Sequence, residues 1–260
     1  MVSIRNQTAL ITGASSGIGA ACAKQFAQAG VKLILAARRM DCLEQLAAQL
    51  TQESQIETHL LSMDVSNRTD VAAILQGLPD AWANVDILVN NAGLSRGLDK
   101  LHEGSIQDWE EMLDTNVKGL LYVTRALVPG MVQRGRGHVV NIGSIAGHQT
   151  YPQGNVYCAS KAAVRALSEG LKQDLLGTPV RVTSVDPGLV ETEFSQVRFR
   201  GDTQRAKNIY KGLTPLTPED VADVVVYCVT RPAHVNISEV LVMPTDQAGA
   251  TLVHRHGEPG

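Results

Sequence analysis

Tyr157 and Lys161 stand four residues apart in the segment Tyr157-Cys-Ala-Ser-Lys161, 13 residues after Ser144. Residues i and i+4 of a helix lie on one face, so a phenol and an ammonium point into the same space. An ammonium beside a phenol favours the phenolate and lowers its pKa from about 10. The pair therefore predicts a general acid and base for an alcohol oxygen. Ordinary helix surfaces carry such pairs too, so the interpretation depends on the other motifs.

Length and composition are typical of one α/β domain: 260 residues, 44% hydrophobic and 19% charged. The net charge of -3 gives no general attraction to nucleic acid or to anionic membranes. We find no export signal and no apolar run of about 18 residues, so we expect a cytoplasmic protein without a membrane span. The cysteines form no CxxC pair and are expected to be reduced thiols, without a disulfide or zinc site: Cys22, Cys42, Cys158 and Cys228.

Short apolar runs alternate with longer amphipathic stretches, a pattern that predicts βαβ units and a parallel sheet. We expect strands at residues 8–12, 32–37, 57–63, 85–89, 138–142, 180–185 and 240–243. We expect helices at residues 17–29, 70–78, 106–127, 155–176, 203–211 and 218–229, and one beginning at Asp41 with a capping box to Glu44. The whole chain, 1–260, is then one domain with a polar tail over about 246–260.

The first strand and first helix are joined by Thr12-Gly-Ala-Ser-Ser-Gly-Ile-Gly19. Glycines let the backbone turn tightly and approach a pyrophosphate, while the helix N-terminus directs its free N–H groups at the anion. The spacing GxxxGxG is a variant of the dinucleotide-binding fingerprint. A tight turn without a ligand is the alternative, but the position between strand and helix favours the dinucleotide.

The end of the second strand indicates which dinucleotide binds. An NAD site usually places an acidic residue there for the ribose hydroxyls, whereas this chain has Ala37 followed by Arg38 and Arg39. Two guanidiniums suit a 2′-phosphate, and Ser15 offers a further hydroxyl, so we expect NADP(H). A solvated basic turn is the alternative. Asp64 and Val65, after the third strand, lie where the adenine ring would rest.

Across nearly its full length the chain resembles the short-chain dehydrogenases/reductases. The matching motifs are TGASSGIG at 12–19, NNAG at 90–93, Asn116, Ser144, YCASK at 157–161 and PG at 187–188. The resemblance implies a single-domain Rossmann fold, a doubly wound parallel sheet of about seven strands flanked by helices. It also implies a homo-oligomer, commonly a tetramer formed through the helices containing Asn116 and Tyr157 and through the last strand.

The second half is similar to the NADP-dependent 3-hydroxy acid (serine) dehydrogenases, through the segments 141–147, 151–161, 187–202 and 232–237. That branch implies oxidation of L-serine, allo-threonine and 3-hydroxy acids, or reduction of 3-oxo acids and semialdehydes. A reductase of another carbonyl substrate, such as a 3-oxoacyl carrier, diketone or sugar ketone, is the alternative with the same chemistry. A dinucleotide-binding regulator without turnover is a third hypothesis, which the complete catalytic set disfavours.

The resemblance assigns four catalytic residues. Tyr157 exchanges the hydroxyl proton, and Lys161 lowers the pKa of Tyr157 and binds the nicotinamide ribose. Ser144 holds the substrate oxygen, and Asn116 kinks the long helix and holds a water that relays protons from Lys161. After the Pro187-Gly188 pair, Thr192 would bind the carboxamide. No metal is expected.

The expected cofactor contacts are Gly13, Ser15, Ser16, Gly17, Ile18, Gly19, Arg38, Arg39, Asp64, Val65, Asn91, Ala92, Gly93, Tyr157, Lys161, Pro187, Gly188, Val190 and Thr192. An acid substrate needs a cation for its carboxylate, and the candidates are Arg96, Arg198 and Arg200. Arg198 and Arg200 lie on an expected lid over residues 194–202. His148, four residues after Ser144, is a further substrate candidate beside Ser144 itself.

Overall fold

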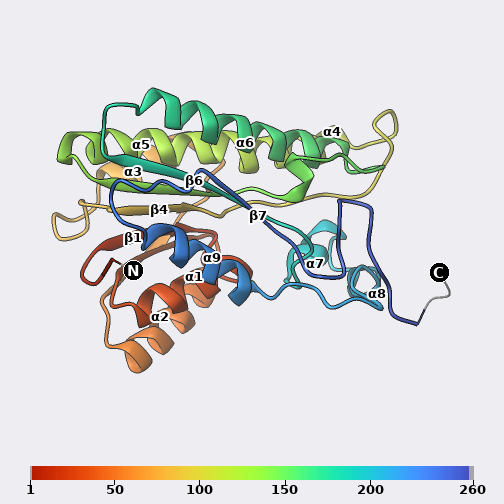
Figure 1. Ribbon diagram of the computed structural model, residues 1–260, viewed down its shortest axis with the longest axis horizontal. Coiled ribbons are helices and arrows are strands. Elements are labelled where there is room, and N and C mark those ends of the chain that lie inside the picture. The colour runs from red at the N-terminus through yellow and green to blue at the C-terminus, as the bar shows by residue number, and fades with distance from the viewer. Residues whose placement is uncertain (1, 258–260) are drawn as a thin grey trace.

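Seven parallel strands form the central sheet of the protein, whose computed structural model describes residues 2–257 (Figure 1). The strand order is β3-β2-β1-β4-β5-β6-β7, so the order reverses between β1 and β4. This is the doubly wound Rossmann arrangement that the sequence predicts. The strands are β1 (Thr8–Thr12), β2 (Lys32–Ala37), β3 (Thr58–Ser62), β4 (Ile87–Asn90), β5 (Gly137–Ile142), β6 (Val180–Pro187) and β7 (Glu239–Val242).

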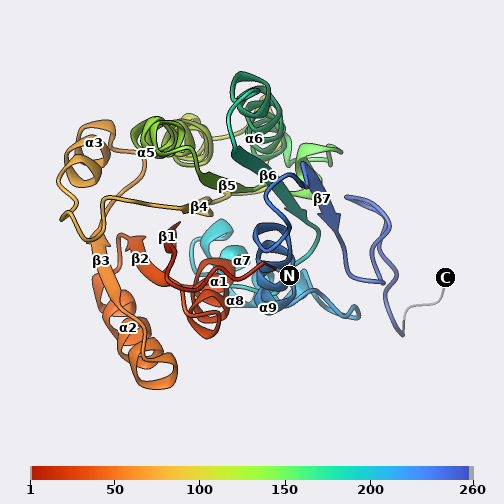
Figure 2. The same ribbon diagram turned by 60° about the vertical axis from the view of Figure 1, so that its left-hand side comes forward.

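Helices cover both faces of the sheet, as Figures 1 and 2 show from two directions. On one face lie α1 (Gly17–Gln28), α2 (Met40–Ser54) and α9 (Pro218–Val229). On the other lie α3 (Arg68–Gln76), α5 (Leu120–Arg134) and α6 (Asn155–Asp174). No helix within residues 2–257 is long and apolar enough to cross a membrane.

The sequences of β1, β2, β4 and β5 are largely apolar runs because these strands are buried on both faces of the sheet. In β1, Ala9 and Ile11 pack toward α1 and α9, whereas Leu10, between them, packs toward α3 and α5. Successive side chains of a strand point to opposite faces, so each strand contributes to two cores. The carboxyl ends of the strands are thereby held at one edge.

The long helix expected at residues 106–127 is three consecutive elements. These are α4 (Ile106–Leu113), a π-helical turn η1 (Asp114–Gly119) and α5. The expectation that the helix stops before Pro129 is wrong, because α5 continues to Arg134. Val128 and Met131, on either side of the proline, are buried in the sheet core, and this packing outweighs the lost helix hydrogen bond.

The second helix begins one residue earlier than expected, and the predicted capping box at Asp41 is wrong. α2 starts at Met40, with Arg39 extended at its N-cap and no side-chain cap. Asp41 therefore lies inside the first turn, where its carboxylate still complements the helix dipole. A side-chain cap is present at α3, where Asn67 accepts from the backbone N–H groups of Thr69 and Asp70.

A lid of two short helices, α7 (Phe194–Arg198) and α8 (Thr203–Asn208), lies at the carboxyl edge of the sheet (Figure 1). The C-terminal segment folds back beside it: His256 donates its backbone N–H to the Gly212 carbonyl, and Val253 pairs with Gln247. Residues 258–260 of the predicted tail lie outside the described residues.

His138 provides a pH-dependent contribution to stability. Its side chain is 2% exposed on β5, its Nε2 lies 2.8 Å from the Thr183 hydroxyl, and burial lowers its pKa to about 3. Folding therefore favours the neutral ring. The stabilisation is complete above the unfolded pKa of about 6.5 and is lost as pH falls toward 3, by roughly 1.4 kcal/mol per pH unit.

We expect His138→Gln to flatten this dependence. Urea unfolding of wild type and variant between about pH 7 and pH 5 measures it, and the wild type should lose about 2 kcal/mol more than the variant. His102→Gln is the control, because the His102 side chain is 75% exposed. Parallel stability curves for wild type and His138→Gln would contradict the interpretation.

Candidate active site

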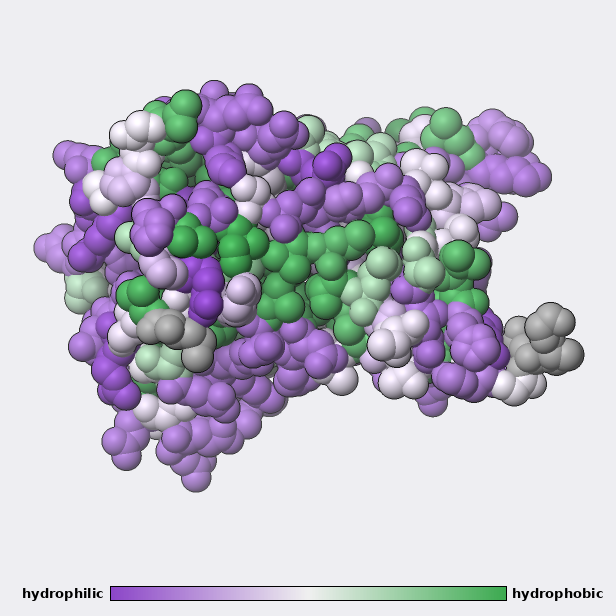
Figure 3. Space-filling model, in the orientation of Figure 1, coloured by the Kyte–Doolittle hydropathy of each residue, from purple (hydrophilic) through white to green (hydrophobic). Residues whose placement is uncertain are grey.

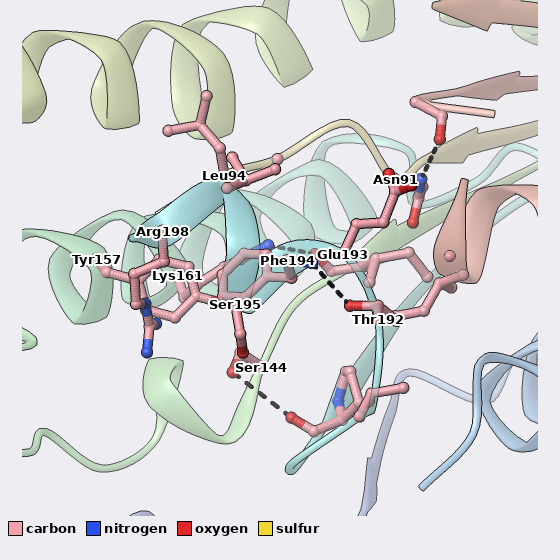
Figure 4. A pocket seen from close by; sticks show the side chains of 18 of the residues that line it. Asn91, Leu94, Ser144, Tyr157, Lys161, Thr192, Glu193, Phe194, Ser195 and Arg198 are labelled. Carbon is pink, nitrogen blue, oxygen red and sulfur yellow. Dashed lines mark hydrogen bonds between the residues drawn. The ribbon is translucent and has the colours of Figure 1, made fainter. Parts of the chain in front are cut away.

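A cavity of about 600 Å³ opens at the carboxyl ends of the strands, where the strand order reverses (Figure 4). Its wall comes from the turns after β1, β2, β3, β4, β5 and β6, from the start of α6 and from the lid. Every residue expected to contact the cofactor lines this cavity except Gly19. Sequence positions spread over residues 13–192 thus meet in one space.

The glycine loop is shaped for close approach to a ligand. Gly13 and Gly17 adopt positive φ values of 64° and 53°, which side chains rarely tolerate. A Cβ on Gly19 would lie 2.4 Å from the Gly13 carbonyl oxygen, so Gly19 serves packing of the loop on α1. Ser16 at the N-cap makes no side-chain cap and the first turn holds no acid, so the N-terminus of α1 suits an anion.

Two arginines stand at the end of β2 as expected, beside the small Ala37. The Nη2 of Arg39 donates to the hydroxyls of Ser16 at 2.8 Å and Ser15 at 3.2 Å. Arg38 lies 3.8 Å from the carboxylate of Asp64. Guanidinium and hydroxyl donors therefore converge at the place predicted for a 2′-phosphate.

Asn91 fixes the crevice between β1 and β4. Its side-chain amide donates to the carbonyls of Thr12 at 2.9 Å and Gly13 at 3.1 Å. The Thr12 hydroxyl in turn accepts the backbone N–H groups of Asn91 and Ala92. These four hydrogen bonds hold the glycine loop against the turn after β4.

Tyr157 and Lys161 project into the cavity from the first turns of α6, opposite Ser144 (Figure 4). Ser144 follows β5, where its hydroxyl accepts the Ala146 N–H and so caps a short 3-10 turn. The ammonium of Lys161 donates to the Ile142 carbonyl at 2.8 Å. Phenol, ammonium and hydroxyl therefore share one end of the cavity, as the helical spacing predicts.

The pKa values of Tyr157 and Lys161 depend on their burial and on the charges around them. Burial raises the pKa of Tyr157, and the main opposing influence is the guanidinium of Arg198, 5.3 Å from the ring centroid. The ammonium of Lys161 is directed at the Ile142 carbonyl, and its effect on the Tyr157 pKa stays a prediction. Burial itself lowers the pKa of Lys161 to about 8, against the attraction of Asp186.

Asn116 lies inside the π-helical turn that interrupts the expected long helix. Its amide bonds both backbone groups of Leu94, donating to the carbonyl and accepting the N–H, each at 2.8 Å. It also donates to the Ser160 hydroxyl at 3.0 Å. Asn116 lies behind the cavity wall, and a Cβ placed on Gly93 would be 3.3 Å from Asn116 Oδ1 and 3.6 Å from Lys161 Nζ.

Of the substrate candidates Arg96, Arg198, Arg200 and His148, Arg198 alone lines the cavity. It donates to the Tyr151 hydroxyl at 3.0 Å, and its guanidinium lies 5.1 Å from the Phe194 ring centroid. Its Nε is buried and has no hydrogen-bond partner among the described residues. A buried donor without a partner is costly, and a ligand that accepted a hydrogen bond from this nitrogen would remove that cost.

The other candidates are engaged elsewhere. Arg96 pairs with Glu111 at 2.6 Å, and Arg200 pairs with Asp108. The Nε2 of His148 lies 2.7 Å from Asp186, so His148 faces the sheet rather than the cavity. These three side chains lie outside the cavity lining, and their part in substrate binding stays a prediction.

His148, Asp186 and Glu239 place one potential metal-ligating atom each within 4.8 Å of one another. Within residues 2–257 no other group of three such side chains is this close. Arg165 pairs with Glu239 at 2.6 Å and supplies a positive charge there. We therefore interpret the group as an ion-pair network between β6, β7 and α6.

Sequence reasoning missed Tyr151, Tyr210 and Glu193, all of which line the cavity. The Tyr210 hydroxyl donates to the Val190 carbonyl at 2.8 Å and bonds Ser195 at 2.9 Å, which fastens the lid. The Glu193 carboxylate forms an ion pair with Arg39, whose Nη2 lies 2.9 Å from Oε2. Both contacts join residues far apart in the chain, so no local pattern signals them.

Comparison with known proteins identifies the family. Residues 7–202 match the short chain dehydrogenase family. The chain belongs to this family. An NADP-dependent 3-hydroxy acid dehydrogenase of Escherichia coli (strain K12) is 49% identical over 248 residues, 95% of this chain and 98% of the relative. A protein of the same description from Schizosaccharomyces pombe is 44% identical over 256 residues, 98% and 99% of the two chains.

Solved structures agree. The closed form of a serine dehydrogenase complexed with NADP+ superposes with a TM-score of 0.90 and 48% identity, covering 96% of this chain and all of that one. An alcohol dehydrogenase of Thermococcus sibiricus complexed with 5-hydroxy-NADP has a TM-score of 0.82 and 31% identity, covering 94% and 99%. The resemblance read from the motifs is thus confirmed.

Proposed function

We propose that the protein is an NADP-dependent oxidoreductase for small 3-hydroxy acids, of the L-serine and allo-threonine type, and for the matching 3-oxo acids or semialdehydes. One observation carries the proposal: a single cavity joins an anion-binding glycine loop and paired arginines to a tyrosine-lysine pair beside Arg198. The names of the similar dehydrogenases support the same cofactor and substrate class.

The residues present fit the dinucleotide. Gly13 and Gly17 leave room for a pyrophosphate at the N-terminus of α1, and Arg39 with the loop serines would hold a 2′-phosphate. Thr192 lies across the loop, its methyl 3.3 Å from the Cβ position of Gly17. When bound, the nicotinamide supplies the acceptor or donor of the hydride.

Tyr157 would move the hydroxyl proton. Because burial raises its pKa, the phenol stays protonated in the closed site and suits donation to a carbonyl oxygen. For oxidation a nearby cation must favour the phenolate, and Arg198 is the cation in contact. Ser144 would orient the same oxygen. We assign Asn116 to the proton path because Asn116 and Lys161 approach one point beside Gly93.

Arg198 would bind the substrate carboxylate. Its unpartnered buried Nε and its place over the Tyr157 ring put a cation next to the reacting oxygen. In a 3-hydroxy acid the carboxylate carbon is two bonds from the reacting carbon. The carboxylate can therefore contact Arg198 while the hydroxyl contacts Tyr157. The observation favours an acid over a neutral diketone or sugar.

We further propose a homo-oligomer, a tetramer by family resemblance, in the cytoplasm. Apolar side chains gather over the edge strand β7 in Figure 3, where Leu241 is 43% exposed. Tyr227 on the adjoining α9 is 50% exposed, and a free sheet edge of this kind is usually covered. The free cysteines suit a reducing compartment.

Initial rates test the proposed function. NADP reduction should be seen with L-serine, L-allo-threonine or 3-hydroxyisobutyrate, and NADPH oxidation with malonic semialdehyde, each faster than with NAD or NADH. If a generic ketone is reduced but none of the acids is turned over, the assignment of 3-hydroxy acids as substrates would be wrong. The assignment of the protein as an NADP-dependent oxidoreductase would stand. Absence of turnover with all of them would favour a non-catalytic regulator.

Tyr157→Phe should lower kcat by about 10²- to 10⁴-fold, since the proton donor is lost, while NADPH binding changes only a few-fold. Tyr151→Phe removes a hydroxyl from the same wall and should cost about tenfold or less, because it breaks only the bond to Arg198. Equal activity of Tyr157→Phe and wild type would place the proton donor elsewhere.

Arg198→Met should raise KM for 3-hydroxy acids by roughly 10- to 100-fold, the worth of a charged hydrogen bond of about 1.5–3 kcal/mol. Turnover of a small neutral ketone should change less. Arg200→Met is the matched control, because Arg200 lies outside the cavity and pairs with Asp108. A similar loss for acid and neutral substrates would argue against carboxylate binding.

A further inference from the structure

An ion pair connects the lid to the adenosine end of the cavity. The carboxylate of Glu193 lies 2.9 Å from Nη2 of Arg39, the same nitrogen that donates to the Ser15 and Ser16 hydroxyls. Glu193 is the N-cap residue of α7, so it stands where the lid begins. The sequence separates the two charges by 154 residues.

The pair has a chemical consequence for each partner. The guanidinium of Arg39 attracts anions, but its Nη2 is already paired with the Glu193 carboxylate. The pKa of Glu193 is lowered by the hydrogen bond from Arg39, so Glu193 is ionised at neutral pH. A phosphate brought to Arg39 and the two serines would meet this negative charge directly.

A phosphate can displace the Glu193 carboxylate from Arg39. The side chains of Arg39 and Glu193 are 48% and 49% exposed, and pairs of that exposure hold weakly. A phosphate monoester carries more charge than a carboxylate and offers three acceptor oxygens to the guanidinium and hydroxyls. The second carboxylate of the cavity wall, Asp64, pairs with Arg38 and lies 3.8 Å from it.

We propose that Glu193 competes with the 2′-phosphate of the cofactor: it occupies the donors of the 2′-phosphate site and is displaced by that phosphate, which frees the start of the lid. The proposal rests on the proposed use of NADP. It makes the adenosine end control residues 193–202, which include Arg198 over the Tyr157 ring. NAD, without a 2′-phosphate, leaves the ion pair in place.

The first test is cofactor affinity, measured by fluorescence titration of NADPH and NADH. Glu193→Gln removes the competing charge and should tighten NADPH by about three- to fivefold, the range of a partly exposed ion pair. NADH affinity should stay unchanged. Glu191→Gln is the matched control, because it makes the same charge change two residues earlier, where the side chain is exposed.

The outcomes separate this inference from the cofactor assignment. If the wild type binds NADPH and Glu193→Gln binds it equally well or more weakly, the phosphate does not displace Glu193. The assignment of NADP as cofactor would then still stand. Wild type that does not bind NADPH would overturn both.

The second test is hydrogen exchange of the lid amides with fragments that lack nicotinamide. In wild type, 2′,5′-ADP should raise exchange over residues 193–202 and 5′-ADP should not. In Glu193→Gln, exchange should already be raised without ligand. Lower exchange with 2′,5′-ADP than without it would mean that the ion pair persists around the phosphate, and would contradict the proposal.

Discussion

The hydrogen bonds between Thr12 and Asn91 hold together the two strand ends on which the site depends. β1 and β4 are neighbours but belong to opposite halves of the sheet, and their turns diverge to opposite faces. Hydrogen bonds of the Asn91 side chain and the Thr12 hydroxyl connect the two turns. Gly13 then lies so close to the β4 turn that an added Cβ would be 2.9 Å from the Ala92 backbone. The shape of the glycine loop and its place against the turn after β4 follow from this constraint.

Much of the fold and of the cofactor end was predictable from the sequence because both are local. Continuous apolar strands, glycines at a strand-helix turn and two arginines after Ala37 are patterns within a few residues, and all lie where expected. Tyr157 and Lys161 met for the same reason, since one helix carries both.

Long-range contacts could not be predicted in this way. Glu193 meets Arg39 and Arg198 meets Tyr157 only through the folding of the lid. His148 stands four residues after Ser144, yet the buried Asp186 draws it away from the cavity. The expected helix ended at residue 127, but α5 continues past Pro129 because the neighbours of the proline are buried in the sheet core.

The central claim is that the carbon carrying the hydroxyl of a 3-hydroxy acid gives its hydrogen to the nicotinamide in this cavity. The most direct measurement is to incubate the protein with NADP and L-serine deuterated at C3, and to determine the mass of the NADPH formed. The account predicts NADPH that carries deuterium. NADPH formed without deuterium, or no NADPH from any 3-hydroxy acid, would contradict it.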